Sequence, residues 1–243
     1  MKKKSKKNNN IFKILSVCLL VITLVLSILF ISTIKRLEKP LPKPKLTTGI
    51  RGSIYGIDDN INEKTIDNYL DRSDTVYRDV RMLVDPANWE AKGGDRFLSG
   101  YIRGFEVIPY AYLGGFKKDY IAQKKKEGVS GLYEGETLFS LNKNGEYEPN
   151  YEESMSILEE IFPKDKNIII VCGAGGYAGE TKKMLVQLGW DENKIYNMGG
   201  YWFYEGKNNI KVKYERNGKN YYNFAIVPYH DIDFNKLHEV END

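Results

Sequence analysis

The segment "NIIIVCGAGGYAGETKKMLVQLG", Asn167 to Gly189, decides the fold. It opens with an apolar run that is too short for a helix and is apolar on both sides, as a central parallel strand would be. A glycine-rich turn follows, and apolar residues then recur at helical spacing up to Gly189, a common helix stop. A strand, a turn and a helix in this order predict an α/β domain built on a parallel sheet.

The turn itself has two interpretations. From Gly173 it reads "GAGGYA", which fits the G-x-G-x-x-A pattern that seats a dinucleotide pyrophosphate at a helix N-terminus. That site also needs an acidic residue about 20 positions later, at the end of the next strand. Here that strand reads "IYNMGG", and only about 65 residues follow Gly179, too few for a full nucleotide-binding sheet. The dinucleotide interpretation therefore fails in its context.

The second interpretation starts one residue earlier, at Cys172. A cysteine between the carboxyl end of a strand and a helix N-terminus lies where backbone N–H groups favour negative charge. We therefore expect a lowered pKa and a good nucleophile. The glycines at 173, 175 and 176 would let the amides form a nest around an anion. A purely structural turn, whose cysteine caps a buried strand, is the alternative.

The rest of the globular region predicts further short elements. The segment 113–150 is long and polar for a connection, so we expect an insertion over one edge of the sheet. Asn217-Gly218 between two β-rich runs indicates a hairpin. Trp190 and Trp202 are expected to be core aromatics. The remaining predicted elements are a short amphipathic helix in 63–74 that carries Ile66, Tyr69 and Leu70, strands in 74–84, 106–112 and 194–200, and a helix over 152–162.

The N-terminus differs sharply in composition. Residues 1–13 carry six lysines and form a basic tail, and 14–34 is an apolar run without a charged residue. Such a run matches the hydrocarbon core of a bilayer, so a transmembrane anchor is predicted. The excess of basic residues before the run predicts a cytoplasmic N-terminus and an exported remainder. Processing as a lipoprotein at Cys18, or cleavage as a signal peptide, is the alternative.

We expect a stiff Pro/Lys-rich linker over 35–48, a domain over 49–206, and a C-terminal hairpin and tail over 207–243. Cys172 is the one cysteine beyond the membrane run, so an exported domain would carry a free thiol. His230 and His238 fit no metal motif, and we predict no metal site and no cofactor. The expected contacts are a small sulfur compound and, through the N-terminal helix, the membrane. No nucleic-acid partner is expected, and no protein partner is identified.

The chain resembles the rhodanese domain family in four segments, which occur in the family's order. They are "VYRDVR" (76–81), "GYIRGFEVIP" (100–109), "VCGAGGYAG" (171–179) and "LGWDENKIYNMGGYWFYEG" (188–206). The resemblance implies a doubly wound, mostly parallel sheet with helices on both faces. It also implies sulfur transfer, in which the loop cysteine holds a sulfane sulfur as a persulfide and passes it to a thiol or cyanide.

Carried over to this chain, the resemblance makes Cys172 the catalytic sulfur acceptor. The cradle that binds the substrate is the loop Gly173, Ala174, Gly175, Gly176, Tyr177 and Ala178. Tyr177 stands where the family often has arginine, so thiosulfate binding would rely on backbone amides and the helix dipole. Arg81 would point to this loop or pair with Asp79.

A non-catalytic module that binds an anion, senses sulfane sulfur or docks a partner is the alternative function. Phosphatases of related fold need an arginine in the cysteine loop, and none occurs between Cys172 and Lys182.

Overall fold

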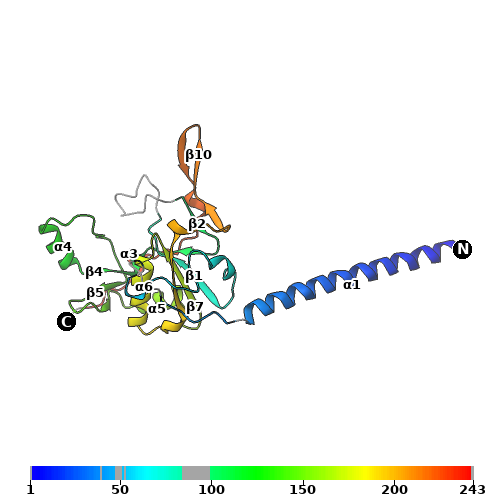
Figure 1. Cartoon of the computed structure of the whole chain (residues 1–243), viewed down its shortest axis with the longest axis horizontal. Coiled ribbons are helices and arrows are strands. Elements are labelled where there is room, and N and C mark those ends of the chain that lie inside the picture. The colour runs from blue at the N-terminus through cyan, green and yellow to red at the C-terminus, as the bar shows by residue number, and fades with distance from the viewer. Residues whose placement is uncertain (1, 39, 47–50, 52, 84–98, 242–243) are drawn as a thin grey trace. The chain divides into compact units, whose positions relative to one another are not determined.

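The computed structural model describes residues 2–38, 40–46, 51, 53–83 and 99–241; in the first helix, side chains are described for Lys13–Ser32. The chain divides into two compact units, Met1–Leu41 and Pro42–Asp243. Figure 1 shows the first unit as one helix and the second as a mixed α/β body. Each unit is described by itself below.

The first unit contains α1, Lys2–Glu38. Its segment Lys13–Ser32 has a mean hydropathy of 3.1 and is long and apolar enough to cross a membrane, a test that a signal sequence also passes. All of its described side chains are exposed. In a bilayer they would face lipid, where a helix satisfies its own backbone polar groups. Among the described residues, this is the one helix long and apolar enough to cross a membrane, as expected from the apolar run.

The second unit is built on a four-stranded parallel sheet in the order β3-β1-β7-β8. β7 lies in the middle and pairs in parallel with β1 on one side and β8 on the other. The α/β architecture and the central position of the apolar strand are thus confirmed. The strands are β1 (Thr75–Asp79), β3 (Glu106–Val107), β7 (Asn167–Cys172) and β8 (Ile195–Gly200).

One face of this sheet carries the main hydrophobic core. Ile168 and Ile170 of β7 pack there with apolar residues of α5, Ser154–Ile161, and α6, Gly176–Gln187. Figure 1 shows both helices beside β7. The short helix α3, Tyr110–Leu113, contributes Leu113 to the same cluster. The predicted helices over 152–162 and after the cysteine turn are therefore confirmed.

The opposite face of the sheet was expected to carry helices as well, but its cover is different. Ile169 and Val171 are fully buried there. Tyr77 of β1 donates a hydrogen bond to the Tyr69 carbonyl, and its ring centroid lies 5.4 Å from that of Phe105. The cover near Tyr69 includes the 3₁₀ turn η2, Ile66–Asn68. The helices α3, α5 and α6 all contribute to the core on the first face of the sheet. On the second face, the helical pattern near residue 66 forms a single 3₁₀ turn.

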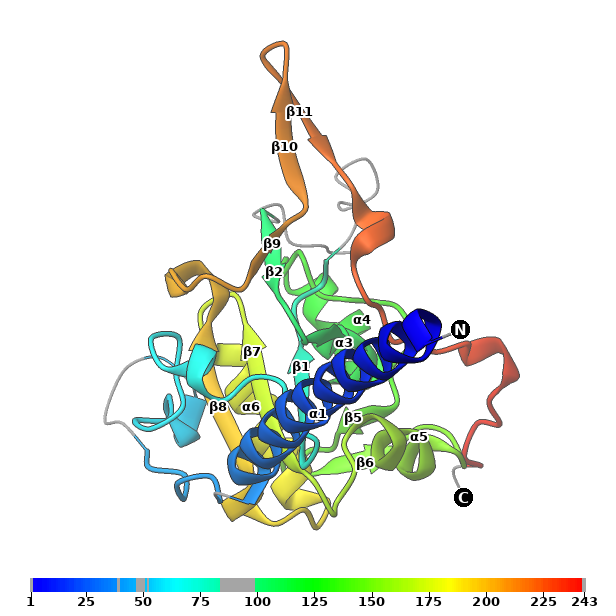
Figure 2. The same cartoon turned by 90° about the vertical axis from the view of Figure 1, so that its right-hand side faces the viewer.

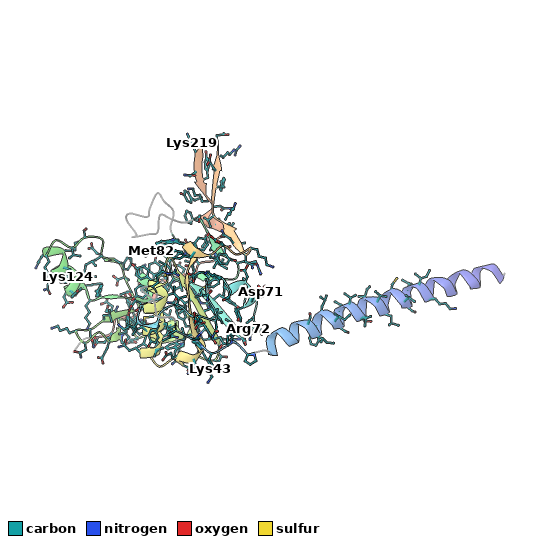
Figure 3. The ribbon with its side chains drawn as sticks, in the orientation of Figure 1. Lys43, Asp71, Arg72, Met82, Lys124 and Lys219 are labelled. Atoms are coloured by element: carbon teal, nitrogen blue, oxygen red, sulfur yellow. The ribbon has the colours of Figure 1, made fainter. Side chains whose placement is uncertain are left out.

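Residues 113–150 are more than a polar insertion. They form a three-stranded sheet and the helix α4, Lys118–Lys126, on which Figure 3 labels Lys124. Leu138, Phe139 and Tyr147 belong to the main core cluster. The segment expected as an insertion over one edge therefore also supplies part of the core, which its polar composition did not indicate. Its strands are β4 (Gly114–Phe116), β5 (Phe139–Leu141) and β6 (Tyr147–Pro149).

The C-terminal part returns to the body of the unit after a projecting hairpin. β9, Asn209–Lys211, pairs antiparallel with β2, Gly100–Ile102. β10, Lys213–Arg216, and β11, Lys219–Tyr222, pair across Asn217-Gly218, which both have positive φ. Figure 2 shows this hairpin extending away from the sheet, and Figure 3 labels its Lys219.

The tail then adds to the sheet edge, where the His230 amide donates to the Val107 carbonyl at 2.8 Å. The part of the proline-rich stretch nearest the domain also packs on it. The Tyr196 hydroxyl donates to the Pro42 carbonyl at 3.0 Å, and the Lys45 amide donates to Asp58 at 2.7 Å. The remaining 3₁₀ turns are η1 (Ser53–Tyr55), η3 (Glu192–Lys194), η4 (Tyr201–Phe203), η5 (Phe224–Ile226) and η6 (Phe234–Lys236).

Candidate functional site

The predicted site residues lie at the end of β7, in the turn that follows it and in the first turn of α6, at the carboxyl edge of the parallel sheet. Cys172 is the last residue of β7, and α6 begins four residues later at Gly176. Gly175 caps the helix with φ of 104°, a conformation that favours glycine. The carboxyl ends of parallel strands meet at this edge, which is where α/β sheets bind ligands.

The sulfur of Cys172 lies in a nest of backbone amides. The Gly175 N–H donates to Sγ with 3.0 Å between nitrogen and sulfur. The backbone N–H groups of Ala174 and Ala178 also favour a negative charge on this sulfur. The arrangement is therefore a nest of backbone donors of the kind that binds anions.

The expected lowering of the thiol pKa is wrong, however. Cys172 is only 2% exposed, and burial raises the pKa of its thiol. The three loop amides oppose this effect, and the carboxylate of Asp79 adds to it. Desolvation therefore outweighs the amides in the resting protein, because removing a thiolate from water costs more than the donors return.

The outer side of the loop is held by a second set of donors. The Trp202 amide donates to the Gly173 carbonyl at 3.1 Å, and the Asn197 side chain donates to the Gly175 carbonyl at 3.0 Å. The Arg51 guanidinium contacts the Ala174 carbonyl at 3.5 Å. In a trans peptide the C=O and N–H point in opposite directions. Donors outside the loop thus turn its N–H groups inward.

One glycine at the end of β8 and one in the loop itself allow this close packing. A Cβ on Gly200 would overlap the Gly173 carbonyl and lie 2.7 Å from the Ala174 Cα. A Cβ on Gly173 would lie 2.7 Å from Cζ2 of Trp202. Trp202 was expected in the core, but it is half exposed and its ring covers the loop; Trp190 is buried as expected.

Tyr177 lies at the outer end of the loop and is mostly exposed. Its ring stacks on Tyr110 with 5.0 Å between centroids and 18° between planes. The Tyr110 hydroxyl in turn lies 2.9 Å from that of Tyr147. Tyr177, at the position where the rhodanese resemblance would place an arginine, therefore presents an aromatic surface.

Arg81 forms the structural pair that was one of its two predicted roles. It is buried and donates to both carboxylate oxygens of Asp79. It also donates to the Gly100 carbonyl at 3.0 Å and lies 3.9 Å above the Tyr201 ring. This arginine thus joins the ends of three segments beside the loop, with its charge balanced by Asp79.

Arg51 is the site residue that the sequence analysis missed. Its Nη2 lies 2.7 Å from Oε1 of the buried Glu63, and its guanidinium lies 4.1 Å from the Phe203 ring centroid. More than a hundred residues separate it from the loop, and its neighbours in sequence form no motif. No local pattern could have placed it there.

The histidines have other partners. Nδ1 of His238 lies 2.6 Å from Oε1 of Glu153, which raises the histidine pKa. Nδ1 of His230 lies 3.5 Å from Oε1 of Glu106. Within the described ranges, no cluster of three or more His, Cys, Asp or Glu residues could hold a metal ion.

No protein-family model matches the chain, and neither does any curated protein or solved structure. A thiol at the N-terminus of a helix, with the Gly175 N–H directed at its sulfur, can bear a negative charge once it loses its proton. The same donors can stabilise an anionic sulfur attached to it.

Proposed function

We propose that the globular unit is a rhodanese-like domain that transfers sulfane sulfur through a persulfide on Cys172. The observation that carries this proposal is the hydrogen bond from the Gly175 N–H to the Cys172 sulfur, at the start of α6, where the Ala174 and Ala178 amides also favour a negative charge. The rhodanese-like arrangement is supported by the parallel sheet and by the order of its segments along the chain, although the helices named above lie on one face of that sheet. The substrate would be a small compound with a sulfane sulfur, such as thiosulfate.

The reaction divides into two displacements. The Cys172 thiolate attacks the outer sulfur of the donor; the donor's S–S bond breaks, and with thiosulfate the leaving group is sulfite, which takes the bonding electrons. Cyanide or a thiolate then attacks the terminal sulfur of the persulfide, and Cys172 leaves as thiolate. No external oxidant or reductant is needed, and a covalent intermediate divides one transfer into two easier steps.

The chain's own groups would act on the charge of the sulfur. The amides of Ala174, Gly175 and Ala178 stabilise the thiolate and the persulfide anion. The helix dipole of α6 adds to this effect at its N-terminus. Because the loop lacks a cationic side chain, the anionic donor would be bound mainly by backbone N–H groups.

A second candidate is a module of low or no turnover, which binds an anion, senses sulfane sulfur or docks a partner. The raised pKa and deep burial of Cys172 favour it, because little thiolate would be present at neutral pH. The amide nest would still hold an anion or a slowly formed persulfide in such a module.

We further propose that α1 anchors the protein in a cell membrane as a single span. The lysines before the span favour a cytoplasmic N-terminus and an extracytoplasmic domain. The sulfur donor and acceptor would then be met outside the cytoplasm.

Thiocyanate formation by the full-length protein in detergent tests the enzymatic proposal. Thiosulfate, polysulfide and mercaptopyruvate serve as donors with cyanide as acceptor, and Cys172→Ser is the control. Turnover by the wild type alone is expected for a sulfurtransferase. A persulfide on Cys172 without turnover would favour the sensing module. If neither turnover nor a persulfide occurred with any donor, the proposed sulfur chemistry would be contradicted.

A further inference from the structure

The peptide unit between Ala174 and Gly175 is held from both sides. On the inner side, its N–H donates to the Cys172 sulfur at 3.0 Å. On the outer side, its carbonyl faces Nη1 of Arg51 at 3.5 Å. The negative end of this peptide dipole thus faces a cation, and its positive end faces the sulfur.

The chain segment that bears Arg51 is fixed to the site by further contacts. The Ser53 hydroxyl donates to the Glu180 carboxylate on α6. The Asn197 side chain donates to the Gly56 carbonyl at 2.7 Å and to the loop carbonyl of Gly175 at 3.0 Å. Arg51 therefore lies at the loop because its own segment is attached to α6 and β8.

Glu63 is the other charge in this arrangement. It is 6% exposed, and its Oε1 lies 2.7 Å from Nη2 of Arg51. Its carboxylate also lies against Gly199, where a Cβ would overlap it. The carboxylate orients the guanidinium and offsets part of its charge at the sulfur.

We propose that Arg51 is a positioning residue for the sulfur-binding loop. It holds the Ala174–Gly175 peptide with its N–H toward Cys172, and it adds positive charge behind that N–H. A hydrogen-bonded chain from guanidinium to carbonyl and from N–H to sulfur polarises along its length, which strengthens the inner bond when the sulfur is anionic. The catalytic meaning of this inference rests on the proposed function, but its test does not need turnover.

Other charged groups lie on the elements that adjoin the loop and must be held constant. Asp79 and Arg81, at the end of β1, form a buried pair of opposite charge. Glu180, on α6, bonds to Ser53 and lies 3.9 Å from Lys183. The variants below leave Asp79, Arg81, Glu180 and Lys183 in place.

The test is the rate at which iodoacetamide, an uncharged reagent, alkylates Cys172. Full-length protein in detergent is used, with Cys18→Ser so that a single thiol reacts. The pH profile is measured for the parent and for Arg51→Gln, Arg51→Lys and Glu63→Gln, and thermal unfolding of each variant is recorded beside it.

At a fixed pH below the thiol pKa, Arg51→Gln should slow alkylation about three- to tenfold and move the profile to higher pH. Arg51→Lys should restore part of the rate. Glu63→Gln, which leaves the guanidinium charge without its offset, should speed alkylation and move the profile to lower pH. These opposite shifts are the result that supports the proposal.

A profile for Arg51→Gln that superimposes on the parent would overturn it. So would shifts of the same sign for Arg51→Gln and Glu63→Gln, since general loosening of the loop would produce that pattern. If the wild type shows no sulfur transfer but the opposite shifts appear, the positioning role stands and the proposed enzymatic function alone fails.

Discussion

The backbone N–H of Gly175 points at the sulfur of Cys172, with 3.0 Å between nitrogen and sulfur. Gly173 and Ala174 join the two residues, and neither carries a charged side chain. The loop therefore acts on the sulfur through its backbone. This relationship is what connects a short sequence motif to a chemical role.

The close packing of this loop on the end of β8 predicts a steric effect. Gly200→Ala would place a methyl group against backbone atoms of Gly173 and Ala174, which a side-chain rotation cannot relieve. We expect a loss of about 1–3 kcal/mol of stability, or about 2–4 °C in the unfolding midpoint for each kcal/mol. We also expect much slower alkylation of Cys172, because the amides move away from the sulfur.

Gly176→Ala is the matched control for this substitution. A Cβ at Gly176 meets no atom within 4 Å, and the residue is the first of α6. Its unfolding midpoint should equal or slightly exceed that of the wild type, since alanine is the better helix former. Equal effects of the two substitutions would contradict the packing described here.

The burial of Cys172 predicts the pH dependence of its reactivity. Because burial raises the thiol pKa, the thiolate fraction should keep rising with pH above about 8.5, the ordinary cysteine range. The folded state also holds this proton more tightly than the unfolded state. The resulting stability is fully present below the unfolded thiol's pKa and is lost as pH rises from there through the higher pKa of the folded protein.

Alkylation rates of the Cys18→Ser protein between neutral and alkaline pH provide the measurement. The same protein in urea, where the thiol is in water, should reach its plateau at lower pH. If the folded protein reached its plateau at a lower pH than the unfolded protein, the result would contradict the effect of burial.

The buried pair of Asp79 and Arg81 predicts a structural phenotype. Arg81→Met would leave a buried carboxylate without its ion partner, at a cost of about 3–5 kcal/mol. The double variant Asp79→Asn/Arg81→Met should be more stable than Arg81→Met alone. A normal unfolding midpoint for Arg81→Met with a raised thiosulfate KM would instead make Arg81 a substrate-binding residue.

The N-terminal helix predicts both membrane attachment and orientation. The protein should remain with the membrane after alkaline carbonate extraction. In a Cys18→Ser/Cys172→Ser background, Lys219→Cys on the exposed hairpin should react with an impermeant maleimide in intact cells. Lys4→Cys should react only after lysis, and the reverse pattern would contradict export of the domain.

Much of the fold followed from local patterns. The apolar run of β7, the glycine turn and the periodic residues of α6 each carry their own signal, because strand, turn and helix depend on residues close in sequence. The Asn217-Gly218 turn is also local, since both residues adopt the positive φ that a tight hairpin needs.

Long-range packing did not follow in the same way. Arg51 reaches Ala174 across 123 positions. Lys182 is buried on α6 and donates from Nζ to the Ile195 carbonyl at 2.9 Å, although a lysine normally indicates an exposed face. The raised pKa of Cys172 depends on how completely the surrounding segments exclude water. Such features arise from tertiary contacts that sequence periodicity does not encode.

In the proposed reaction, the sulfur of Cys172 accepts a sulfane sulfur. Mass spectrometry of the full-length protein after incubation with thiosulfate tests it most directly. We predict a mass gain of one sulfur atom, about 32 Da, on the peptide that contains Cys172; cyanide should remove it, and Cys172→Ser should never acquire it. The absence of this adduct with thiosulfate, polysulfide and mercaptopyruvate, in protein whose Cys172 can still be alkylated, would contradict the account.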